Sequence, residues 1–426
     1  MSSNAPVSVP DRRSIVGKIV RVSSGNFIEM YDFIVYGYYA TYIADAFFPL
    51  HNQFSSLMLS LMTFGAGYLM RPLGALVLGS YIDRHGRRKG LILTLLLMAL
   101  GTLSMAITPS YSSIGVIAPL VVLAGRLLQG LSAGVELGGV SVYLLEIATA
   151  GHRGFYTAWQ SASQQVAVVF TAVMGIILTA KLSSAEMSAW GWRVPFAIGC
   201  LIVPALLWLR SSLEETEAFE KSERPESTRE SFHLVQQNWR LIVLGMMLAV
   251  LTTVTFYLIT AYTPTFDKTA LHLRAIDAFT VTLCIGVSNF VWLLAGGALS
   301  DRFGSRPLLI AMPLICLLTA WPTMAWLVAR PSFLRLLTVE LWYSPFYGVY
   351  NGAMVPFVIG SMPQKIRTTG FALSYSLATA LFGGFTPAVA TYLIHLTGNR
   401  AAPTLWLSMA ALLSLIAAVI SRPRSV

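Results

Sequence analysis

The sequence has 426 residues, of which 55% are hydrophobic and only 11% charged, and its formal net charge is +10. A soluble domain carries about 25% charged residues, so most of this chain must face lipid. The basic residues interrupt apolar runs instead of sharing one polar surface, which is typical of loops between membrane helices and argues against nucleic acid as a partner.

Twelve apolar stretches are long enough to cross a bilayer, which takes about 20 helical residues. They cover residues 19–43, 56–82, 90–108, 116–147, 154–180, 191–211, 239–264, 276–300, 307–329, 333–361, 369–397 and 401–421. The sequence therefore predicts an all-α membrane protein of twelve transmembrane helices. The polar stretch 212–238 divides it into an N-terminal six-helix half (1–211), a cytoplasmic linker and a C-terminal six-helix half (239–426).

The distribution of lysine and arginine predicts the orientation. If both termini are cytoplasmic, most of the 29 basic residues fall on cytoplasmic segments. This agrees with the positive-inside rule, which relates such an excess to the cytoplasmic side. We therefore expect a multi-pass protein whose two ends both lie in the cytoplasm.

A short basic loop occurs twice, about half a chain apart. The first copy, Gly79–Gly90, reads GSYIDRHGRRKG, and the second, Gly296–Leu309, reads GGALSDRFGSRPLL. The matching positions are Asp83 with Asp301, Arg84 with Arg302, Gly86 with Gly304 and Arg88 with Arg306. The repeat indicates a bundle built from two related halves.

Ionisable side chains inside spans are costly, so each one is a candidate functional residue. We find them gathered in the first half: Glu29, Asp32, Arg71, Arg126 and Glu136. Two acids and two arginines at similar depth indicate a polar cavity. A guanidinium matches a carboxylate with two hydrogen bonds, so a vacant arginine implies an anionic substrate. The alternative is that the arginines only neutralise the acids.

Uncharged polar residues complete the predicted cavity lining. Any single one is more often a hydrogen bond between helices than a ligand contact, but as a group at mid-depth they favour a substrate site. The candidates are Asn26, Gln129, Gln160, Gln164, Tyr257, Asn289, Tyr350 and Asn351.

Motifs for other chemistry are missing from the sequence. The three cysteines, Cys200, Cys284 and Cys316, lie in separate apolar runs, which predicts neither a disulfide framework nor a metal site. A Gly-x-x-x-x-Gly-Lys-Ser/Thr loop does not occur, which argues against a built-in ATPase. We expect no enzymatic activity and no cofactor.

Three longer motifs resemble the metabolite–proton symporters, a branch of the major facilitator transporters. They are Ser24–Ile43, Phe64–Gly90 and Gly125–Ala148, and the resemblance extends over nearly the whole chain. It is greatest to the citrate and tricarballylate transporters of that branch. The resemblance implies a proton-coupled importer of citrate or a close tricarboxylate, which works by alternating access of its two halves as a monomer in the lipid bilayer of the bacterial inner membrane.

The resemblance also implies roles for particular residues. Asp32 and Arg126 take the places of an acid and an arginine that related sugar symporters pair for proton coupling, with Glu29 and Glu136 as further candidate proton carriers. Ser305 and Pro307 replace basic positions of the second loop, so we expect a weaker gate there. The cytoplasmic gate is assigned to Asp83, Arg87, Arg88, Glu146, Arg153, Asp301, Arg302 and Arg306.

Two alternatives to this function remain open at this stage. The first changes only the substrate, to another metabolite such as 2-oxoglutarate, shikimate or betaine; two candidate arginines favour a multivalent anion instead. The second is a membrane receptor that senses its ligand without moving it. The linker 212–238 is the only long polar segment, which leaves little room for a signalling domain.

Overall fold

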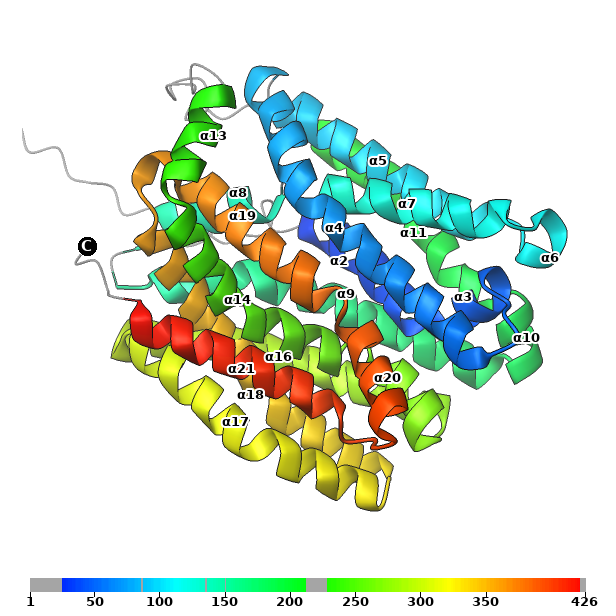
Figure 1. Cartoon of the computed structure of the whole chain (residues 1–426). Coiled ribbons are helices and arrows are strands. Elements are labelled where there is room, and N and C mark those ends of the chain that lie inside the picture. Colours follow the sequence, from blue (N-terminus) through cyan, green and yellow to red (C-terminus); the bar gives the residue numbers. More distant parts are fainter. Residues whose placement is uncertain (1–24, 86, 135, 150, 212–227, 422–426) are drawn as a thin grey trace, which may run out of the picture.

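The computed structural model describes residues 25–421 except 86, 135, 150 and 212–227, and every regular element in that part is a helix (Figure 1). A helix satisfies its backbone hydrogen bonds within its own segment, which is the condition for crossing lipid. Eight helices in the described ranges are long and apolar enough to span a membrane. Each of the twelve predicted spans corresponds to one helix or to consecutive helices of the structure.

The first half contains the elements that match spans one to six. They are α2 (Gly25–Tyr38), α3 (Ala40–Phe47), α4 (Gln53–His85), α5 (Arg87–Ile107), α7 (Ile117–Ala133), α8 (Glu136–Glu146), α9 (Arg153–Lys181), η1 (Gly191–Arg193) and α11 (Val194–Ser211). The short helices α6 (Tyr111–Ile114) and α10 (Ser184–Ala189) lie in the connections.

The second half repeats this plan after the linker helix α13 (Thr228–Gln237). Its elements are α14 (Trp239–Ile259), α15 (Thr263–Phe266), η2 (Asp267–Leu271), α16 (Ala275–Phe303), α17 (Ser305–Ala329), α18 (Phe333–Ser361), η3 (Gln364–Ile366), α19 (Arg367–Ala378), η4 (Thr379–Gly383), α20 (Thr386–Thr397) and α21 (Pro403–Ile420).

Several spans are interrupted rather than continuous. The first span breaks at Tyr39 and the seventh at Thr260–Tyr262, which are comparable places in the two halves. The eleventh passes through the π-helical turn η4. Interrupted helices and π-helical turns are common at the binding sites of transporters, so these breaks direct attention to the centre of the bundle.

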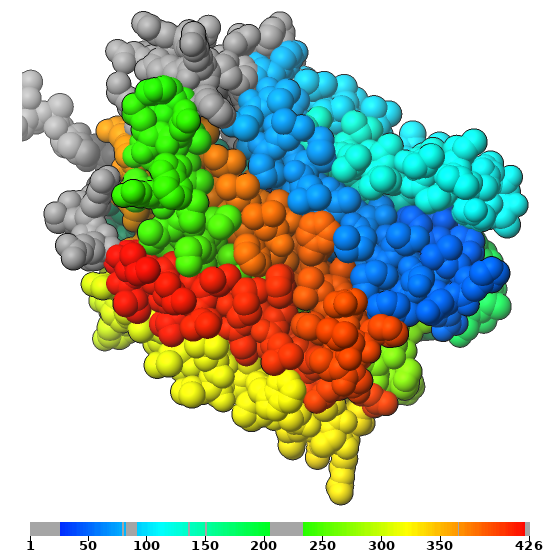
Figure 2. Space-filling model, viewed as in Figure 1, coloured from blue at the N-terminus to red at the C-terminus, as the bar shows by residue number. Residues whose placement is uncertain are grey.

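The two halves touch at both ends of the bundle. A Cβ atom on Gly154 of α9 would lie 2.5 Å from the carbonyl oxygen of Gly297 of α16, so these helices meet through glycines. Near the other end, a Cβ on Gly37 would lie 2.9 Å from the Cβ of Ala261. Along the visible face, α4 packs against α19 and α20 (Figure 2). The structure therefore has the middle of the bundle closed from both sides.

The predicted orientation leads to a topology experiment. The linker helix α13 and the end of α21 lie at the same end of the bundle (Figure 1). We expect reporters fused at Pro225 and at the C-terminus to read cytoplasmic, and one inserted near His51 to read periplasmic. A matched pair of phosphatase and fluorescent-protein fusions measures this; a periplasmic signal from Pro225 would contradict the twelve-span topology.

Candidate functional site

Arg71 of α4 and Glu29 of α2 form a buried ion pair near the middle of the bundle. Arg71 Nη2 lies 2.6 Å from Glu29 Oε1, and the two side chains are 4% and 1% exposed. The guanidinium also lies 4.8 Å from the ring centroids of both Phe33 and Tyr68. The charge of Arg71 is thus compensated inside the protein by Glu29. This is the arrangement described by the alternative from the sequence, in which the arginines only neutralise the acids.

Arg126 of α7 is held by an amide instead of an acid. Its Nη1 donates to Gln129 Oε1 at 2.7 Å, while Nε and Nη2 have no hydrogen-bond partner among the described residues. The side chain is fully buried. A buried donor without a partner costs about 1–3 kcal/mol. Nε and Nη2 form one edge of the guanidinium fork, so both donors of this edge are without a partner among the described residues.

Asp32 is connected to Arg126 through two uncharged side chains. Gln129 Nε2 donates to Thr102 Oγ1 at 3.1 Å, and Thr102 Oγ1 donates to Asp32 Oδ2 at 2.5 Å. The other oxygen, Asp32 Oδ1, has no partner in the part of the chain that the structure describes. The acid and the arginine are thus not in direct contact. They belong to one hydrogen-bonded chain, so a change at one end alters the partners of the other.

An aromatic box encloses both arginines. Arg126 lies 4.4 Å from the ring centroid of Phe33, 4.7 Å from Tyr36 and 5.3 Å from Phe64. Phe33 contacts both guanidiniums, so the two cations share a wall. Aromatic faces attract cations, which stabilises charge in a site closed to water. The sequence analysis missed these rings; the aromatic pairs at spacings of three and four in spans one and two were the available signal.

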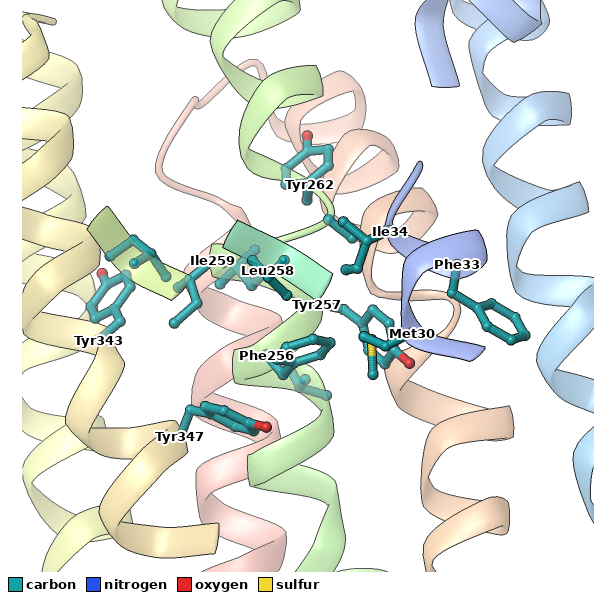
Figure 3. Packing of buried hydrophobic residues seen from close by; sticks show 14 of the residues in the cluster. Met30, Phe33, Ile34, Phe256, Tyr257, Leu258, Ile259, Tyr262, Tyr343 and Tyr347 are labelled. Atoms are coloured by element: carbon teal, nitrogen blue, oxygen red, sulfur yellow. The ribbon is translucent and has the colours of Figure 1, made fainter. Parts of the chain in front are cut away.

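The second half contributes Tyr257 of α14 to the same site. Its ring lies 5.1 Å from Tyr68 and 6.1 Å from Phe64, both on α4. Figure 3 shows Tyr257 beside Met30 of α2, with Phe33 on the opposite side of that helix. Tyr257 therefore contacts the first-half site from across the interface, and its role as a lining residue stays a prediction.

Two other predicted residues of the second half have partners within their own half. Asn351 Nδ2 donates to Thr252 Oγ1 at 2.9 Å, and its Oδ1 has no partner among the residues described. The Tyr350 hydroxyl donates to the backbone oxygen of Leu248 at 2.9 Å, which is a contact between packed helices. Asn351 retains a free acceptor for a ligand, whereas Tyr350 serves the packing of α18 on α14.

Asn289 of α16 takes part in a polar contact between the halves. Its Nδ2 donates to Gln165 Oε1 of α9 at 3.3 Å, and Ser344 Oγ donates to Asn289 Oδ1 at 2.6 Å. Gln165 Nε2 also donates to the hydroxyl of Tyr347 at 3.4 Å. The sequence analysis did not single out Gln165. Gln164 and Gln165 are adjacent in one span, and the sequence does not show which of the two side chains points toward the other half.

The remaining predicted lining residues lie on α2 and α9. Asn26 Nδ2 donates to the backbone oxygen of Gln160 at 3.5 Å, and Asn26 Oδ1 and Gln160 Nε2 have no partner in the described ranges. Gln164 is also buried. The side chain of Glu136 lies outside the described residues.

One expectation about charge is wrong. The sequence analysis placed the intramembrane charges in the first half only, but Glu340 of α18 is 5% exposed. It lies inside the predicted tenth span, so it is a candidate functional residue in the same way as Glu29 and Asp32 of α2.

The structure describes part of the cytoplasmic gate that was assigned from the resemblance. Asp301, at the end of α16, accepts hydrogen bonds from the backbone N–H groups of Gly154 (2.6 Å to Oδ1) and Phe155 (2.8 Å to Oδ2) at the start of α9. At a helix N-terminus, a carboxylate accepts from backbone N–H groups that have no partner within the helix. The helix dipole stabilises its negative charge. Asp301 thus holds the two halves together at this end.

The other gate residues are less engaged. Arg306 Nη2 donates to the backbone oxygen of Val419 at 3.4 Å, and Arg302 lies over the ring of Phe303. Glu146 and Arg153 are exposed. The side chains of Asp83, Arg87 and Arg88 lie outside the part of the structure that is described.

We expect Asp301→Asn to favour opening at this end. An amide accepts through one oxygen only and lacks the charge, and hydrogen bonds to charged groups contribute about 1.5–3 kcal/mol. The open fraction should rise about tenfold, which corresponds to ~1.4 kcal/mol. The measurement is the rate at which a thiol reagent labels Ala158→Cys, buried in α9, in a background without Cys200, Cys284 and Cys316.

The control for this experiment is Asp277→Asn, on the same helix but in its first turn. It removes the same charge far from the α9 contact, so the labelling rate should stay unchanged. Equal labelling rates in Asp301→Asn and in the unmodified protein would contradict the gating role of this carboxylate.

Comparisons with known proteins agree with this architecture. Residues 22–380 match the family model described as Major Facilitator Superfamily. The chain is 55% identical over 417 residues to a citrate-proton symporter of Salmonella typhi, covering 98% of this chain and 96% of that protein. It is also 55% identical to a citrate-proton symporter of Klebsiella pneumoniae (98% and 94% covered) and 31% identical to an alpha-ketoglutarate permease of Escherichia coli (92% and 90% covered).

Solved structures show the same fold. A crystal structure of a D-xylose-proton symporter superposes with a TM-score of 0.76 at 18% identity, covering 95% of this chain and 96% of that one. A partially occluded inward open xylose transporter from Escherichia coli superposes with a TM-score of 0.75 at 16% identity, covering 95% and 96%. The twelve spans in two halves are therefore the major facilitator fold, and the chain belongs to the major facilitator superfamily.

Proposed function

We propose that this chain is a proton-coupled symporter that imports citrate by alternating access of its two halves. The observation that carries the proposal is the 55% identity, over 98% of the chain, to two citrate-proton symporters. The protein works as a monomer in the bacterial inner membrane with both termini in the cytoplasm. It acts as a transporter and not as an enzyme.

The unpartnered Nε/Nη2 edge of Arg126 is the proposed anchor for one citrate carboxylate. Nε and Nη2 point in parallel from the guanidinium, and a carboxylate that accepts from both makes the bidentate contact that arginine favours. The acceptor-only carboxylate also removes the penalty of leaving these donors unpaired. Asn26, Gln160 and Asn351 each retain a free polar atom for the rest of the substrate.

Proton coupling follows from the chain that connects Arg126 to Asp32. A carboxylate bound at Nε and Nη2 neutralises the guanidinium from which Gln129 accepts at Nη1. Gln129 in turn donates to Thr102, which donates to Asp32. Substrate binding therefore changes the environment of Asp32. A buried carboxylate without a cation is costly, so binding of the anion and of a proton favour each other.

The substrate is tested by counterflow in proteoliposomes. Vesicles loaded with unlabelled citrate should accumulate labelled citrate transiently, and an external panel of tricarballylate, 2-oxoglutarate, shikimate and betaine shows which compounds compete. Citrate and tricarballylate should compete most strongly. Counterflow that only 2-oxoglutarate or betaine supports would replace the citrate proposal, and binding without any counterflow would indicate a receptor.

A further inference from the structure

The second half holds two buried carboxyl groups that the proposed coupling chain does not use. Glu340 of α18 is 5% exposed, and Asp267, the first residue of η2, is 1% exposed. Burying an ionised carboxylate is costly unless a cation or several hydrogen bonds compensate it. Each of these groups therefore needs a partner or a proton.

Glu340 lines a small cavity. Its Oε1 accepts a hydrogen bond from Thr263 Oγ1 at 2.6 Å, whereas Oε2 has no partner within the described part of the chain. The carboxyl lines a cavity of about 10 Å³. That volume is about the least that one water needs, so the cavity excludes any organic anion. Figure 3 shows other side chains of its wall: Leu258, Ile259, Tyr262 and Tyr343.

Asp267 connects this region to the protein surface. It follows Thr263 by four residues, so the two lie one turn apart along consecutive helical segments. Both of its carboxylate oxygens lack a hydrogen-bond partner among the described residues, and the next residues, Lys268 and Thr269, are exposed. Burial raises the pKa of Asp267 to about 7, and the nearby Asp277 carboxylate adds to the rise. With a pKa in this range, Asp267 can gain or lose a proton near neutral pH.

In the described ranges, the groups that face Glu340 and Asp267 include no positively charged side chain that compensates either carboxyl. Tyr38 of α2 and Tyr343 of α18 lie within the electrostatic reach of Glu340, and neither carries a positive charge. The neighbouring cations are engaged elsewhere. Arg274 Nε and Nη2 each donate to Asp277 at 2.9 Å, and Lys268 Nζ lies 4.0 Å from the ring centroid of Tyr42 and 3.1 Å from Thr41 Oγ1.

We propose that Glu340 is a second proton-binding site of the transport cycle, and that Asp267 is the carboxyl through which the proton reaches it from the periplasm. A proton from water binds a carboxylate oxygen to give the neutral acid and is released to water after access changes; no other bond is altered. The inference rests on the proposed function. An anion with several charges costs about 2.3 kcal/mol per charge per 100 mV to bring inside, and Asp32 carries one proton only.

The stoichiometry of transport tests this site. Glu340→Gln keeps the size and polarity of the side chain but cannot bind the proton. In proteoliposomes that report labelled citrate and membrane current together, the positive charge carried per citrate should fall by one relative to the unmodified protein. Asp267→Asn should keep the stoichiometry and lose a step near pH 7 in the uptake rate. The control is Asp45→Asn, an exposed acid on the same side, which should change neither quantity.

An infrared measurement decides the same question without transport. The difference spectrum of purified protein between acidic and alkaline pH should contain the carbonyl band of a buried carboxylic acid that is missing in Glu340→Gln. Thr263→Val should shift that band, because the Thr263 hydroxyl bonds this carboxyl.

The results separate this site from the proposed function. An unchanged charge per citrate in Glu340→Gln overturns the proposal, as does a spectrum in which neither variant alters the carbonyl band. If the unmodified protein moves no citrate, the proposed function fails, while the band still decides whether Glu340 binds a proton.

Discussion

Asp32→Asn should sharply lower the accumulation of citrate that a pH gradient drives, because each citrate then enters with one proton fewer, while exchange of internal for external citrate stays measurable. The amide cannot take up a proton, but its oxygen still accepts the hydrogen bond from Thr102 that Asp32 Oδ2 accepts now. The chain through Gln129 to Arg126 is then preserved, and so are the unpartnered donors Nε and Nη2 of Arg126. The proton that Asp32 carries is lost and substrate binding is kept.

The measurement compares uptake with a proton gradient to counterflow without one, in the same proteoliposomes. In Asp32→Asn the ratio of internal to external citrate should fall about tenfold under a gradient of one pH unit, which is the effect of one proton fewer per citrate, whereas counterflow continues. Accumulation with a normal pH dependence would exclude Asp32 as the coupling residue. Glu29 would then be the next residue to test, although its ion pair with Arg71 gives it a compensating charge that Asp32 lacks.

The sequence predicted the membrane spans well, because a spanning helix needs a long apolar run and charged residues mark its ends. The interruption at Tyr39 was not predicted. The one at Thr260–Tyr262 precedes Pro264, a residue visible in the sequence, which has no N–H to bond the carbonyl oxygen of Thr260 and so favours a break there. Hydropathy reports where a segment lies, not whether it bends.

The sequence predicted at which depth in the membrane the candidate site residues lie, but not toward which neighbouring helix each side chain points. The positions of Glu29, Asp32, Arg71 and Arg126 along their spans indicate a common level in the membrane, and the structure brings all four to one region. The rotation of each helix decides which acid meets which arginine. Arg71 pairs with Glu29, and Arg126 is left to Gln129.

Thr102 shows why the connecting residues could not be found from the sequence. A single threonine in an apolar run is common in membrane helices, and its hydroxyl often bonds its own backbone, as Thr102 also does to Met98. Only the arrangement of α2, α5 and α7 shows that this hydroxyl joins Asp32 to Gln129. Glu340 is a different case, because a charged residue in an apolar run is visible in the sequence.

Arg126→Lys should weaken citrate binding more than tenfold, whereas Arg71→Lys should leave it nearly unchanged. Both substitutions keep the positive charge and remove the planar fork. At Arg126 the fork presents two unpartnered donors, which an ammonium cannot reproduce for a bidentate carboxylate. The loss corresponds to about 1.4 kcal/mol or more.

Arg71→Lys is the matched control because Arg71 contacts an acid, Glu29, whereas Arg126 contacts an amide, Gln129. Nη2 of Arg71 lies 2.6 Å from Glu29 Oε1, and an ammonium can take the place of that one donor. Removing the charge entirely would be a poorer control. A buried acid left without its partner costs about 3–5 kcal/mol of stability, so loss of binding would then reflect unfolding.

Equilibrium binding of labelled citrate to the purified variants measures both effects, at one pH and with thermal unfolding recorded in parallel. A large loss in Arg126→Lys with near-normal binding in Arg71→Lys assigns the substrate carboxylate to Arg126 alone. Equal losses in the two variants would mean that Arg71 leaves Glu29 to hold a second carboxylate during the cycle. Normal binding in Arg126→Lys would remove the proposed anchor, because nothing else about its buried fork would then require a guanidinium.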